Sequence, residues 1–571
     1  MAKILSSRFG WIFVILVLGV LNIIFSTTSF RMDLTSEKRY TLSDSTRSML
    51  SQLTEPVEIT VFLHGDLPTG FRQLSARTRE MLDEFSLITD NKINYHFEYP
   101  GEDLPDSLRY QLIDSLRQLG VNATNAKART KEGEEQQLVY PGALVEYKGR
   151  VLGIDFLQGQ NMSGGLETLH KAETLLEYKL ASSIRKIIQE KIPRVGYLAG
   201  NGEPLDNSIY DLMQQTLKPN YPVNILPLDQ FPIIPEEFSV LIIVKPTIRF
   251  TDQQKLKLDQ FVMRGGKLIW ALDNLYASID SLQRSEGSFI AFDMGLNLED
   301  QLFRYGVRIN QDLVQDVQCD KIPSVIGTMG GKPQIQLLPW PYFPLLTSPS
   351  AHPISGNLDY IVAQFPQSID TVQAPGIRKT VLLATSSTSR VLSTPAKVEW
   401  QSVRNEDDLA LFNRTSIPIA ILLEGKFKSL FANRITSSQA DTLRLSGQSF
   451  IAENSSENKM VVISDGDLFL NGGTQADGPL PMGMNVFSKM QYANRDFLLN
   501  TLEYMLDPSG IMETRSKDFK LRLLDPAAVE KNKTLWQILA FVIPISIIAS
   551  LGVVFQLMRK RMYAHRNSLK G

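Results

Sequence analysis

Cysteine is nearly absent from this chain, whose 571 residues include a single one, Cys319. No disulfide can form within the chain, and no zinc or iron–sulfur site that needs several cysteines can be built from it alone. The C-x-x-C pair of thioredoxin-type redox enzymes is therefore excluded as well. Cys319 lies among Gln, Asp and Lys without a histidine beside it, so we interpret it as an unreactive thiol.

The motifs of nucleotide hydrolysis and of the common hydrolases are also missing. No G-x-x-x-x-G-K-[ST] sequence occurs, because the Gly-Lys pairs at 266–267, 331–332 and 425–426 are followed by Leu, Pro and Phe. Nothing is therefore expected to hold ATP phosphates in the usual way, and we do not expect an ATPase. The G-x-S-x-G and H-E-x-x-H patterns are absent too, so neither a serine hydrolase nor a zinc hydrolase is supported.

Neither sign of charge dominates: 59 Lys and Arg stand against 61 Asp and Glu, for a net charge of −2. Hydrophobic residues make up 43% and charged residues 21%, which fits folded domains rather than a disordered chain or a basic nucleic-acid binder. At about 150 residues per domain, the length allows three or four domains besides any membrane segment.

Two long apolar runs bracket the chain, at residues 9–25 and 535–558. The first contains one polar side chain, Asn22, and no charge, while the second is uncharged and long enough to cross about 30 Å of hydrocarbon. We predict that both are transmembrane helices and that Pro544 kinks the second. A buried core helix is disfavoured for the second run because it has no polar stripe.

The first run has a second interpretation, as part of a cleaved signal peptide, because Lys3 and Arg8 precede it. Two observations favour a retained helix. The run is longer than the roughly 7 to 15 apolar residues of a signal peptide, and residues 25–30 lack a clear A-x-A cleavage site.

The charges beside these runs predict the topology. The tail at 559–571 carries five Lys and Arg and no acid, and Lys3 and Arg8 lie at the other end, so both termini are expected in the cytoplasm. Five cations between 517 and 533 oppose this orientation, but long loops cross largely regardless of charge. We therefore predict a two-pass inner-membrane protein with a periplasmic central region. Removing the seven flank charges from −2 leaves −9, which offers no polybasic surface to lipid or nucleic acid.

Residues 31–165 are predicted to form a small N-terminal α/β domain. Residues 57–63 and 93–99 alternate like strands and flank a helical pattern at 76–88, an order that favours a parallel strand pair with a right-handed crossover. A hairpin is predicted at 142–156. A thioredoxin-like shape fits this order.

A doubly wound parallel sheet of the flavodoxin or glutamine-amidotransferase kind is predicted for residues 166–310, because short continuous apolar strands alternate with helices there. The predicted strands are 194–198, 223–228, 240–244 and 267–272. Residues 460–510 are expected to add a βα unit that completes this sheet. Residues 311–459 are predicted as an irregular β-rich insertion, in which polar residues 436–459 form a mobile loop.

Five polar residues are expected together at the carboxyl ends of three parallel strands, where open α/β sheets bind ligands. They are Asn201, Glu203, Lys245, Asp273 and Asn274. A small-molecule or glycan pocket at this edge is one hypothesis. The alternative is structural, because Gly and Asn permit tight turns while Asp and Asn cap helices.

Asp465 and Asp467 follow the predicted strand at 460–464 and suggest a divalent cation site. Two carboxylates without further ligands, however, fall far short of a calcium or magnesium signature. We expect no metal and no cofactor. A hydrolytic reaction at acidic side chains on the strand ends is a third interpretation, but no catalytic residue is assigned and no enzyme activity is expected.

Six segments spread over nearly the whole chain resemble a known family. They are residues 40–43 (YTLS), 177–186 (EYKLASSIRK), 200–203 (GNGE), 265–269 (GGKLI), 463–467 (ISDGD) and 494–502 (NRDFLLNTL). On these segments the chain resembles the gliding-motility-associated ABC-transporter auxiliary proteins of Bacteroidetes, the GldG family. At the turn where relatives read Gly-His-Gly-Glu, this sequence has Asn201, so no chemistry is carried over to that turn.

The resemblance implies an inner-membrane complex with an ABC ATPase subunit and a multispanning ABC permease subunit, required for gliding and linked to the associated secretion machinery. The chain itself has two predicted anchors, a large outer α/β region and no nucleotide motif. We therefore expect a non-enzymatic auxiliary subunit of such a complex. The alternative is a membrane-anchored periplasmic protein that binds a glycan or a peptide.

Overall fold

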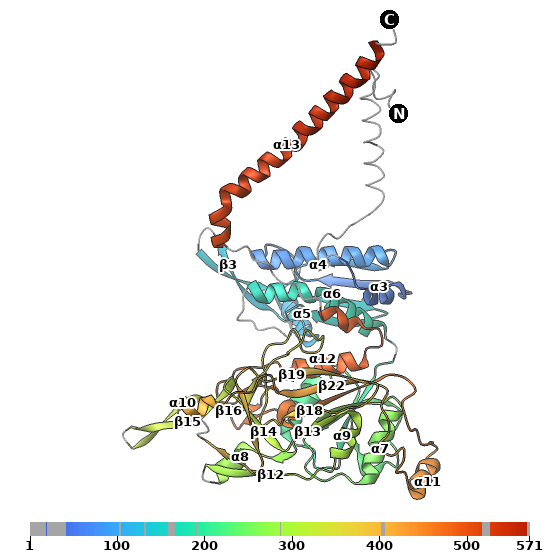
Figure 1. Ribbon diagram of the computed structural model, residues 1–571, viewed down its shortest axis with the longest axis vertical. Coiled ribbons are helices and arrows are strands. Elements are labelled where there is room, and N and C mark those ends of the chain that lie inside the picture. The colour runs from blue at the N-terminus through green and yellow to red at the C-terminus, as the bar shows by residue number, and fades with distance from the viewer. Residues whose placement is uncertain are drawn as a thin grey trace. The chain divides into compact units, whose positions relative to one another are not determined.

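The structure, a computed structural model, describes residue 19 and residues 41–101, 104–130, 133–157, 166–189, 191–285, 287–329, 331–400, 406–516 and 526–567. The chain divides into two compact units, Met1–Asp518 and Phe519–Gly571. Sheets and helices make up the first unit, and one long helix dominates the second (Figure 1). The predicted mixed α/β fold class is confirmed at this level.

A four-stranded sheet forms first, in the order β2-β1-β5-β6. Its strands are β1 (Val57–Val61), β2 (Ile93–Phe97), β5 (Gly142–Tyr147) and β6 (Arg150–Asp155). β1 and β2 are parallel and connected through helix α4 (Thr69–Ile88), whereas β1–β5 and β5–β6 are antiparallel. The predicted parallel pair and the hairpin are confirmed. A separate antiparallel pair precedes β5, formed by β3 (Thr124–Thr130) and β4 (Gly133–Val139).

Apolar residues at helical spacing determine how the helices cover this sheet. Leu74, Leu82 and Phe85 of α4 are fully buried in one core, to which α6 (Leu166–Ile188) also contributes. Helix α5 (Asp106–Gln118) instead packs in a separate apolar cluster. The core of α6 also includes residues of the larger sheet described next, so α6 is a wall shared by the two sheets.

Helix α3 (Asp44–Ser51) is held against α6 by a buried carboxylate. Glu177 of α6 accepts the backbone N–H of Ser43 at 2.8 Å and the hydroxyl of Thr46 at 2.9 Å. Ser43 also caps α3, because its side chain accepts the N–H of Thr46.

The larger sheet has seven strands in the order β19-β22-β23-β10-β9-β7-β8. Their bounds are β7 (Arg194–Ala199), β8 (Val223–Pro227), β9 (Phe238–Val244), β10 (Lys267–Ala271), β19 (Ile377–Ala384), β22 (Pro418–Gly425) and β23 (Asn458–Ile463). The five strands from β8 to β23 are parallel, and β22 and β19 extend them as an antiparallel edge. The predicted strands therefore all lie in this sheet, together with β23.

Alternating residues of each central strand face two different cores, which explains why the strands are apolar throughout. In β9, Ile242 lies in a core with α6 and α12 (Asn494–Leu506), whereas Ile243 lies in a core with α7 (Asp252–Met263) and α9 (Glu299–Tyr305). All strand residues of β9 from Val240 on are fully buried. Helices thus cover both faces of the parallel strands.

Short sheets and a long hairpin surround the strand ends. Their elements are β11 (Leu275–Tyr276), α8 (Ile279–Arg284), β12 (Ser288–Asp293), β13 (Val307–Ile309), β14 (Asp312–Asp316), β15 (Cys319–Met329), β16 (Lys332–Leu346), β17 (Ile361–Val362), β18 (Ile369–Thr371), β20 (Ser389–Ser393), β21 (Ala396–Glu399) and α10 (Glu406–Ala410). β24 (Gly473–Thr474) and β25 (Gly478–Pro479) form a small hairpin after β23.

The mobile loop predicted at 436–459 is wrong in its first part, because Ser437–Leu445 forms helix α11. Thr436 and Gln439 make a reciprocal capping box, and Leu443 is buried against the body. A polar composition does not prevent a helix when both its cap and one apolar anchor are present.

Helix α13 (Pro526–Asn567) contains the apolar run predicted as the second span. Within it, Trp536–Leu557 is uncharged, long enough to cross a membrane and not buried anywhere in the structure. Pro544 lies inside the helix, as expected. The first predicted span, residues 9–25, lies outside the described residues except for residue 19.

Gly425 should not tolerate a side chain. Its φ is +143°, and a Cβ atom would lie 2.0 Å from the backbone oxygen of Gly376 on the neighbouring edge strand. We expect Gly425→Ala to lower the free energy of unfolding by about 1–3 kcal/mol, measured by denaturant unfolding of the full chain with tryptophan fluorescence. Gly327→Ala is the control, since a Cβ there meets nothing within 4 Å. Equal stability of the two variants would contradict the strained geometry.

Candidate functional site

Four charged side chains from three strand ends meet at the carboxyl edge of the parallel sheet. Lys245 follows β9, Asp273 follows β10, and Asp465 and Asp467 follow β23. The Lys245 ammonium lies 3.4 Å from an Asp273 oxygen and 2.5 Å from an Asp467 oxygen. We call these four residues the strand-end cluster. Parallel strands present their carboxyl ends at one edge, which is how residues more than two hundred positions apart come together.

The backbone at this edge is shaped to bring the charges close. Lys245 has a φ of +46°, a conformation that is costly for a residue with a side chain, and its N–H donates to the oxygen of Ala271 at 2.8 Å. Gly466 donates its N–H to Asp273 at 2.7 Å, and a Cβ on it would lie 2.8 Å from the Cβ of Lys245. The absence of a side chain at Gly466 therefore permits the cluster to close.

Asp465 anchors the following turn through both of its carboxylate oxygens. It is fully buried, and its two oxygens accept the backbone N–H groups of Asp467 and Gln364, each at 2.7 Å. Asp467 in turn binds Lys245. The two carboxylates considered as a divalent cation site are thus engaged by N–H groups and an ammonium. Among the described residues, no group of three or more His, Cys, Asp or Glu has the arrangement of a metal site.

The charges in the cluster hold Lys245 in its protonated form. Burial lowers the pKa of the Lys245 ammonium, but the carboxylates of Asp467 and Asp273 outweigh burial, so this pKa lies above its ordinary value. Burial raises the pKa of Asp273 to about 6 against the opposing effect of Lys245. Burial and the neighbouring carboxylates raise the pKa of Asp465 well above its ordinary value. A lysine that stays protonated is neither a general base nor a nucleophile.

Asn201 and Glu203 lie in a separate tight turn after β7. A Glu203 carboxylate oxygen accepts the N–H of Asn201 at 2.7 Å, and the Asn201 carbonyl accepts the N–H of Thr247 at 2.9 Å. Gly202 is required between them, because a Cβ there would lie 2.1 Å from the Thr247 hydroxyl. Within the part of the chain that the structure describes, no hydrogen bond or ion pair joins this turn to the strand-end cluster.

Glu203 is only 6% exposed, and burial raises its pKa to about 7. Its second carboxylate oxygen is buried without a hydrogen-bond partner, as is the side-chain oxygen of Asn201. The Asn201 side-chain amide donates to the side-chain oxygen of Gln254 at 3.1 Å, so the turn is also fastened to the start of α7.

Asn274 points away from the cluster and holds a segment of the insertion. Its N–H donates to the side chain of Gln367 at 3.0 Å, and its side-chain amide donates to the carbonyl of Ile309 at 3.0 Å. Gln367 also receives a hydrogen bond from Ser464 at the end of β23. The insertion therefore covers much of the edge at which a ligand pocket was predicted.

A cavity of about 320 Å³ remains beside Asp467. Both apolar and polar side chains line it, among them Ile279, Phe343, Leu470, Asp320, Gln364 and Asn485. Its volume is near the lower limit for small-molecule sites. Of the five predicted site residues none lines it, and Asp467 alone connects it to the strand-end cluster.

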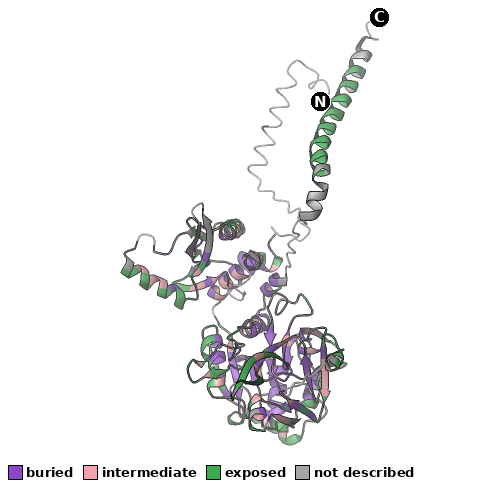
Figure 2. Ribbon diagram, turned by 90° about the vertical axis from the view of Figure 1, so that its left-hand side faces the viewer, coloured by how far each residue is buried: buried purple, intermediate pink, exposed green. Residues whose placement is uncertain are grey.

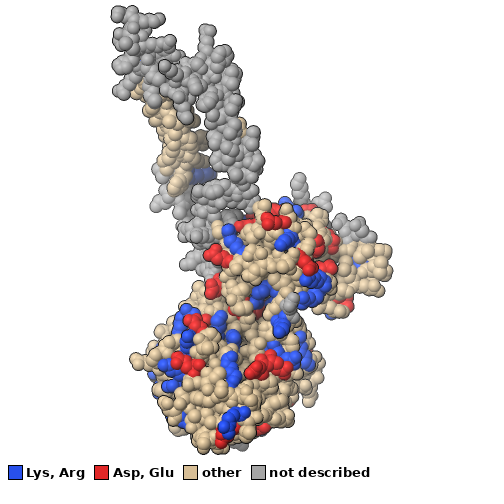
Figure 3. All heavy atoms as spheres, turned by 90° about the vertical axis from the view of Figure 1, so that its right-hand side faces the viewer, with Lys and Arg blue, Asp and Glu red and all other residues tan. Residues whose placement is uncertain are grey.

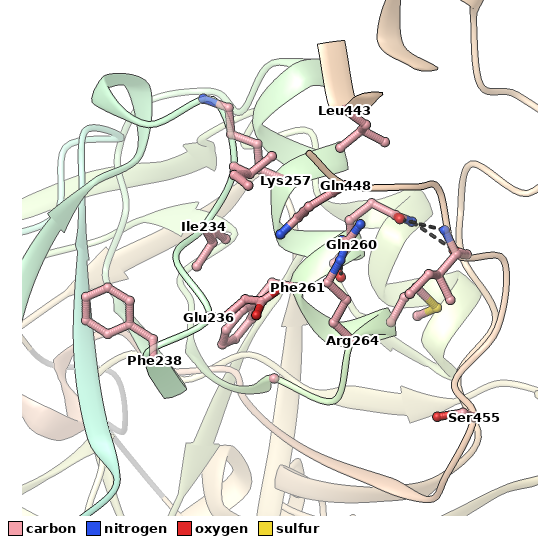
Figure 4. Close-up of a pocket in the computed structure, with 14 residues that line it drawn as sticks. Ile234, Glu236, Phe238, Lys257, Gln260, Phe261, Arg264, Leu443, Gln448 and Ser455 are labelled. Carbon is pink, nitrogen blue, oxygen red and sulfur yellow. Dashed lines mark hydrogen bonds between the residues drawn. The ribbon is translucent and has the colours of Figure 1, made fainter. Parts of the chain in front are cut away.

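A larger pocket, of about 570 Å³, lies at the opposite edge of the sheet, where β9 and β10 begin (Figure 4). We call it the amino-edge pocket. Apolar and polar groups share its walls about equally. The apolar side chains include Ile234, Phe238, Phe261 and Leu443, and the polar side chains include Glu236, Lys257, Arg264 and Gln448. The loop after α11 closes one side, where Gln260 exchanges two hydrogen bonds with the backbone of Ile451.

Sequence reasoning missed the amino-edge pocket, because one of its walls belongs to the segment predicted as a mobile loop. It also placed Asp465 and Asp467 in a hypothetical metal site rather than beside Lys245. The predicted βα unit at 460–510 was a signal for this position. A parallel strand at 460–464 in the same sheet brings Asp465 and Asp467 to the carboxyl edge, where Lys245 and Asp273 lie. Burial raises the pKa of the Cys319 thiol to about 12, which agrees with an unreactive thiol.

Comparison with known families identifies two regions. A family model described as "ABC-type uncharacterized transport system" matches residues 192–501, more than half of the chain. A model for a domain of unknown function (DUF7088) matches residues 36–146. No curated protein matches the sequence.

Solved structures show only distant likenesses. The mmIFT52 N-terminal domain is 11% identical, with a TM-score of 0.29, over 55% of this chain and 96% of that one. PurLQS from Thermotoga maritima is 9% identical, with a TM-score of 0.22; the match covers 55% of this chain and 99% of that one. An exo-beta-1,4-mannosidase from Opitutaceae bacterium strain TAV5 is 12% identical, with a TM-score of 0.18; the match covers 74% of this chain and 51% of that one. At these scores the likenesses carry no argument.

Removing the cation of the cluster should destabilise the chain in a pH-dependent way. Lys245→Met leaves Asp273 and Asp467 without their partner, and we expect a loss of about 3 kcal/mol at about pH 7.5. Because the pKa of Asp273 is raised to about 6 in the folded state, the folded chain keeps a proton on Asp273 at a pH where the unfolded chain has released it. The buried carboxylates therefore lower the stability least at low pH and most above a pH of about 6. The loss should therefore shrink at about pH 5.

Denaturant unfolding of the full chain at the two pH values measures this difference. Lys218→Met is the matched control, because Lys218 is exposed and bonds only Gln214 in the described structure. A loss that is the same at both pH values, or no larger than that of the control, would show that the cluster does not stabilise the sheet.

Proposed function

Because the chain belongs to the family of ABC-type uncharacterized transport system proteins, we propose that it is a non-enzymatic auxiliary subunit of an ABC transporter complex in the inner membrane. Its partners in this proposal are an ABC permease subunit and an ABC ATPase subunit. The observation that carries the proposal is the family match over residues 192–501, which covers the parallel sheet and the strand-end cluster.

The uncharged, unburied segment Trp536–Leu557 supports membrane placement. In our proposal a second span at residues 9–25 accompanies it, both termini are cytoplasmic and the region between the spans is periplasmic. The cation-rich tail at 559–571 supports this orientation. Figure 3 shows Lys and Arg interspersed with Asp and Glu on the described part of the face it displays, which is not the basic face that nucleic-acid binding requires.

Several details of the site support a structural rather than a catalytic role. The Lys245 ammonium is engaged by two carboxylates, Asp465 bonds backbone N–H groups, and Asn274 holds the insertion in place. These contacts use the polar groups at the carboxyl edge to fasten segments of the chain to each other. An accessory subunit needs such a rigid body and no chemistry of its own.

The closer assignment within the family is to the GldG group of gliding Bacteroidetes, on the six segments quoted from the sequence. The strand order β2-β1-β5-β6 supports a thioredoxin-like N-terminal unit. The order of the five parallel strands, β8-β7-β9-β10-β23, supports a flavodoxin-like doubly wound sheet, since it is 2-1-3-4-5 in chain order.

Affinity purification of the full chain from detergent-solubilised membranes tests the proposal. We expect an ABC permease and an ABC ATPase to copurify. Two arginines in the span, Ile547→Arg with Leu551→Arg, should reduce both, because each arginine costs about 2.5–3.5 kcal/mol at the centre of a membrane helix. Ile547→Leu with Leu551→Ile is the control and should retain them. Absence of both subunits with the unmodified chain would count against the proposal.

The amino-edge pocket favours a peptide over a glycan for the alternative function. Its walls are formed by side chains such as Phe238 and Phe261, with Glu236 and Arg264 at hand for polar groups. Apolar side chains suit the leucine or phenylalanine residues of a peptide, and charged groups of both signs suit its polar backbone and charged ends, so this mixed lining fits a peptide. In this alternative the chain is a membrane-anchored peptide-binding protein.

Calorimetric titration of the full chain in detergent tests the alternative. Short peptides rich in leucine and phenylalanine should release heat, whereas simple disaccharides should not. Gln448→Trp should abolish the signal, because the indole fills the pocket that the half-buried Gln448 lines. Gln111→Trp, at an exposed position on α5, should leave it unchanged. No heat with any peptide would remove this alternative.

A further inference from the structure

A long hairpin projects from the first unit. β15 and β16 pair antiparallel from Met329 and Lys332 at the turn back to Cys319 and Pro344. Figure 1 shows them extending beyond the other elements, and Figure 2, which faces the end of the hairpin, colours it as exposed. We call residues 319–346 the arm. The sequence predicted only irregular structure with short strands in this region.

The base of the arm is locked into the body. The ring centroid of Trp340 lies 4.9 Å from that of Phe343 and 5.5 Å from that of Phe365. Trp340 is only 2% exposed. Its indole N–H donates to the carbonyl of Glu399 at 3.3 Å. On the other strand, Asp320 accepts hydrogen bonds from Asn485 and Tyr492. The arm is therefore held in place before any partner binds, which lowers the entropy cost of docking.

Beyond this base the arm exposes large apolar side chains. They are Val325 (58% exposed), Ile326 (47%), Ile335 (62%) and Leu338 (36%). Val325 and Ile335 are direct cross-strand partners, so they form one apolar patch. A single exposed apolar residue needs no explanation, but four on a projecting hairpin are typical of an interaction surface.

Beyond Asp320, which is buried in the base, the arm carries charge of one sign only. No acidic residue occurs from 321 to 358, while Lys321 and Lys332 lie within the hairpin. A chain with 61 acidic residues thus leaves this surface without any. A partner surface that complements it is apolar and carries acidic residues at its border.

Prolines disfavour a second copy of the chain adding to the arm as a further strand. Pro323, Pro333 and Pro339 all lie in the β15–β16 ladder. Proline has no backbone N–H, so within a hairpin it is tolerated where its nitrogen faces away from the paired strand. The outer edges of the hairpin therefore lack hydrogen-bond donors at these positions. The arm is suited to contacts through side chains.

The same segment is poorly suited to entering a lipid surface. Residues 321–339 contain no Trp, Tyr or Phe, the residues that anchor proteins at the membrane interface. The aromatic residues of the arm begin at Trp340 and are buried in its base. The observations therefore favour a protein partner.

Building on the proposed role in a transporter complex, we propose that the arm docks into an apolar groove bordered by acidic residues on another subunit of that complex. Val325 and Ile335 fill the groove, and Lys321 faces its acidic border. The body of the chain supplies the rigid base from which the arm extends.

A photo-crosslinking amino acid in place of Val325, in the full chain and in native membranes, tests the contact. We expect light to link the chain to the permease subunit of the transporter, because the arm lies in the periplasmic region of the proposed topology, whereas the ATPase subunit works on the cytoplasmic side. The same amino acid in place of Leu445, which is 86% exposed on α11, should give no such product. A product only with lipid, a product only with a second copy of the chain, or no product would each overturn the proposal.

Substitutions on the arm test the chemistry. Val325→Ser with Ile335→Ser should lower the recovery of transporter subunits about tenfold, and Lys321→Glu should also lower it, whereas Lys321→Arg should not. Leu411→Ser with Leu445→Ser is the matched control at exposed positions. Unchanged thermal unfolding of each variant verifies that the body is intact.

The two proposals fail in different ways. Full recovery of the transporter subunits with the arm variants would overturn the docking proposal and leave the proposed function standing. Absence of these subunits already with the unmodified chain would overturn the proposed function, and the partner assigned to the arm with it.

Discussion

The ion cluster of Lys245 with Asp273 and Asp467 is the interaction on which the arrangement of the first unit depends. It joins the ends of β9, β10 and β23, and β23 enters the sheet only after the chain has made the whole insertion. Three carboxylates at one buried edge would repel each other without the single ammonium. The left-handed backbone at Lys245 and the glycine at position 466 are local costs that this arrangement requires.

Closing the sheet in this way also determines what the carboxyl edge offers to other molecules. The insertion returns to this edge, where Gln364 and Gln367 bond Asp465 and Asn274. Polar groups that would meet a ligand in many open α/β sheets are used here to hold the chain's own segments. The amino-edge pocket and the arm lie elsewhere, away from the residues of the predicted site.

Helix α6 packs against both sheets of the first unit and connects them. Its apolar residues lie in one core with both sheets, and Arg185 near its end forms an ion pair with Asp507 at 2.9 Å. Lys186 pairs with Glu503 of α12, and burial raises the pKa of Glu503 to about 7. Apolar packing together with buried ion pairs resists relative movement, so a load on the N-terminal sheet is passed to the larger sheet. That property is useful in a subunit that connects other components.

Local pattern was sufficient for much of this fold. Continuous apolar runs identify β7, β9, β10 and β23, since a strand buried on both faces admits no polar residue. An uncharged run of membrane length identifies the segment within α13 for a similar reason. The sequence also predicted that Lys245 and Asp273 lie at the same edge of the sheet, because both come soon after parallel strands, but it did not predict that they form an ion pair. Each of these inferences depends on burial that acts over a few neighbouring residues.

Tertiary structure alone decided the rest. The composition of the arm, rich in Pro and Gly, is that of irregular structure, yet its prolines fit a hairpin whose outer edges are free. Helix α11 exists because a cap and Leu443 find their partners. Asn201 and Glu203 are separated from the cluster, and Asp465 and Asp467 join it, through pairings between distant strands. Such pairings depend on how the whole chain packs, and residue patterns along a short segment do not contain them.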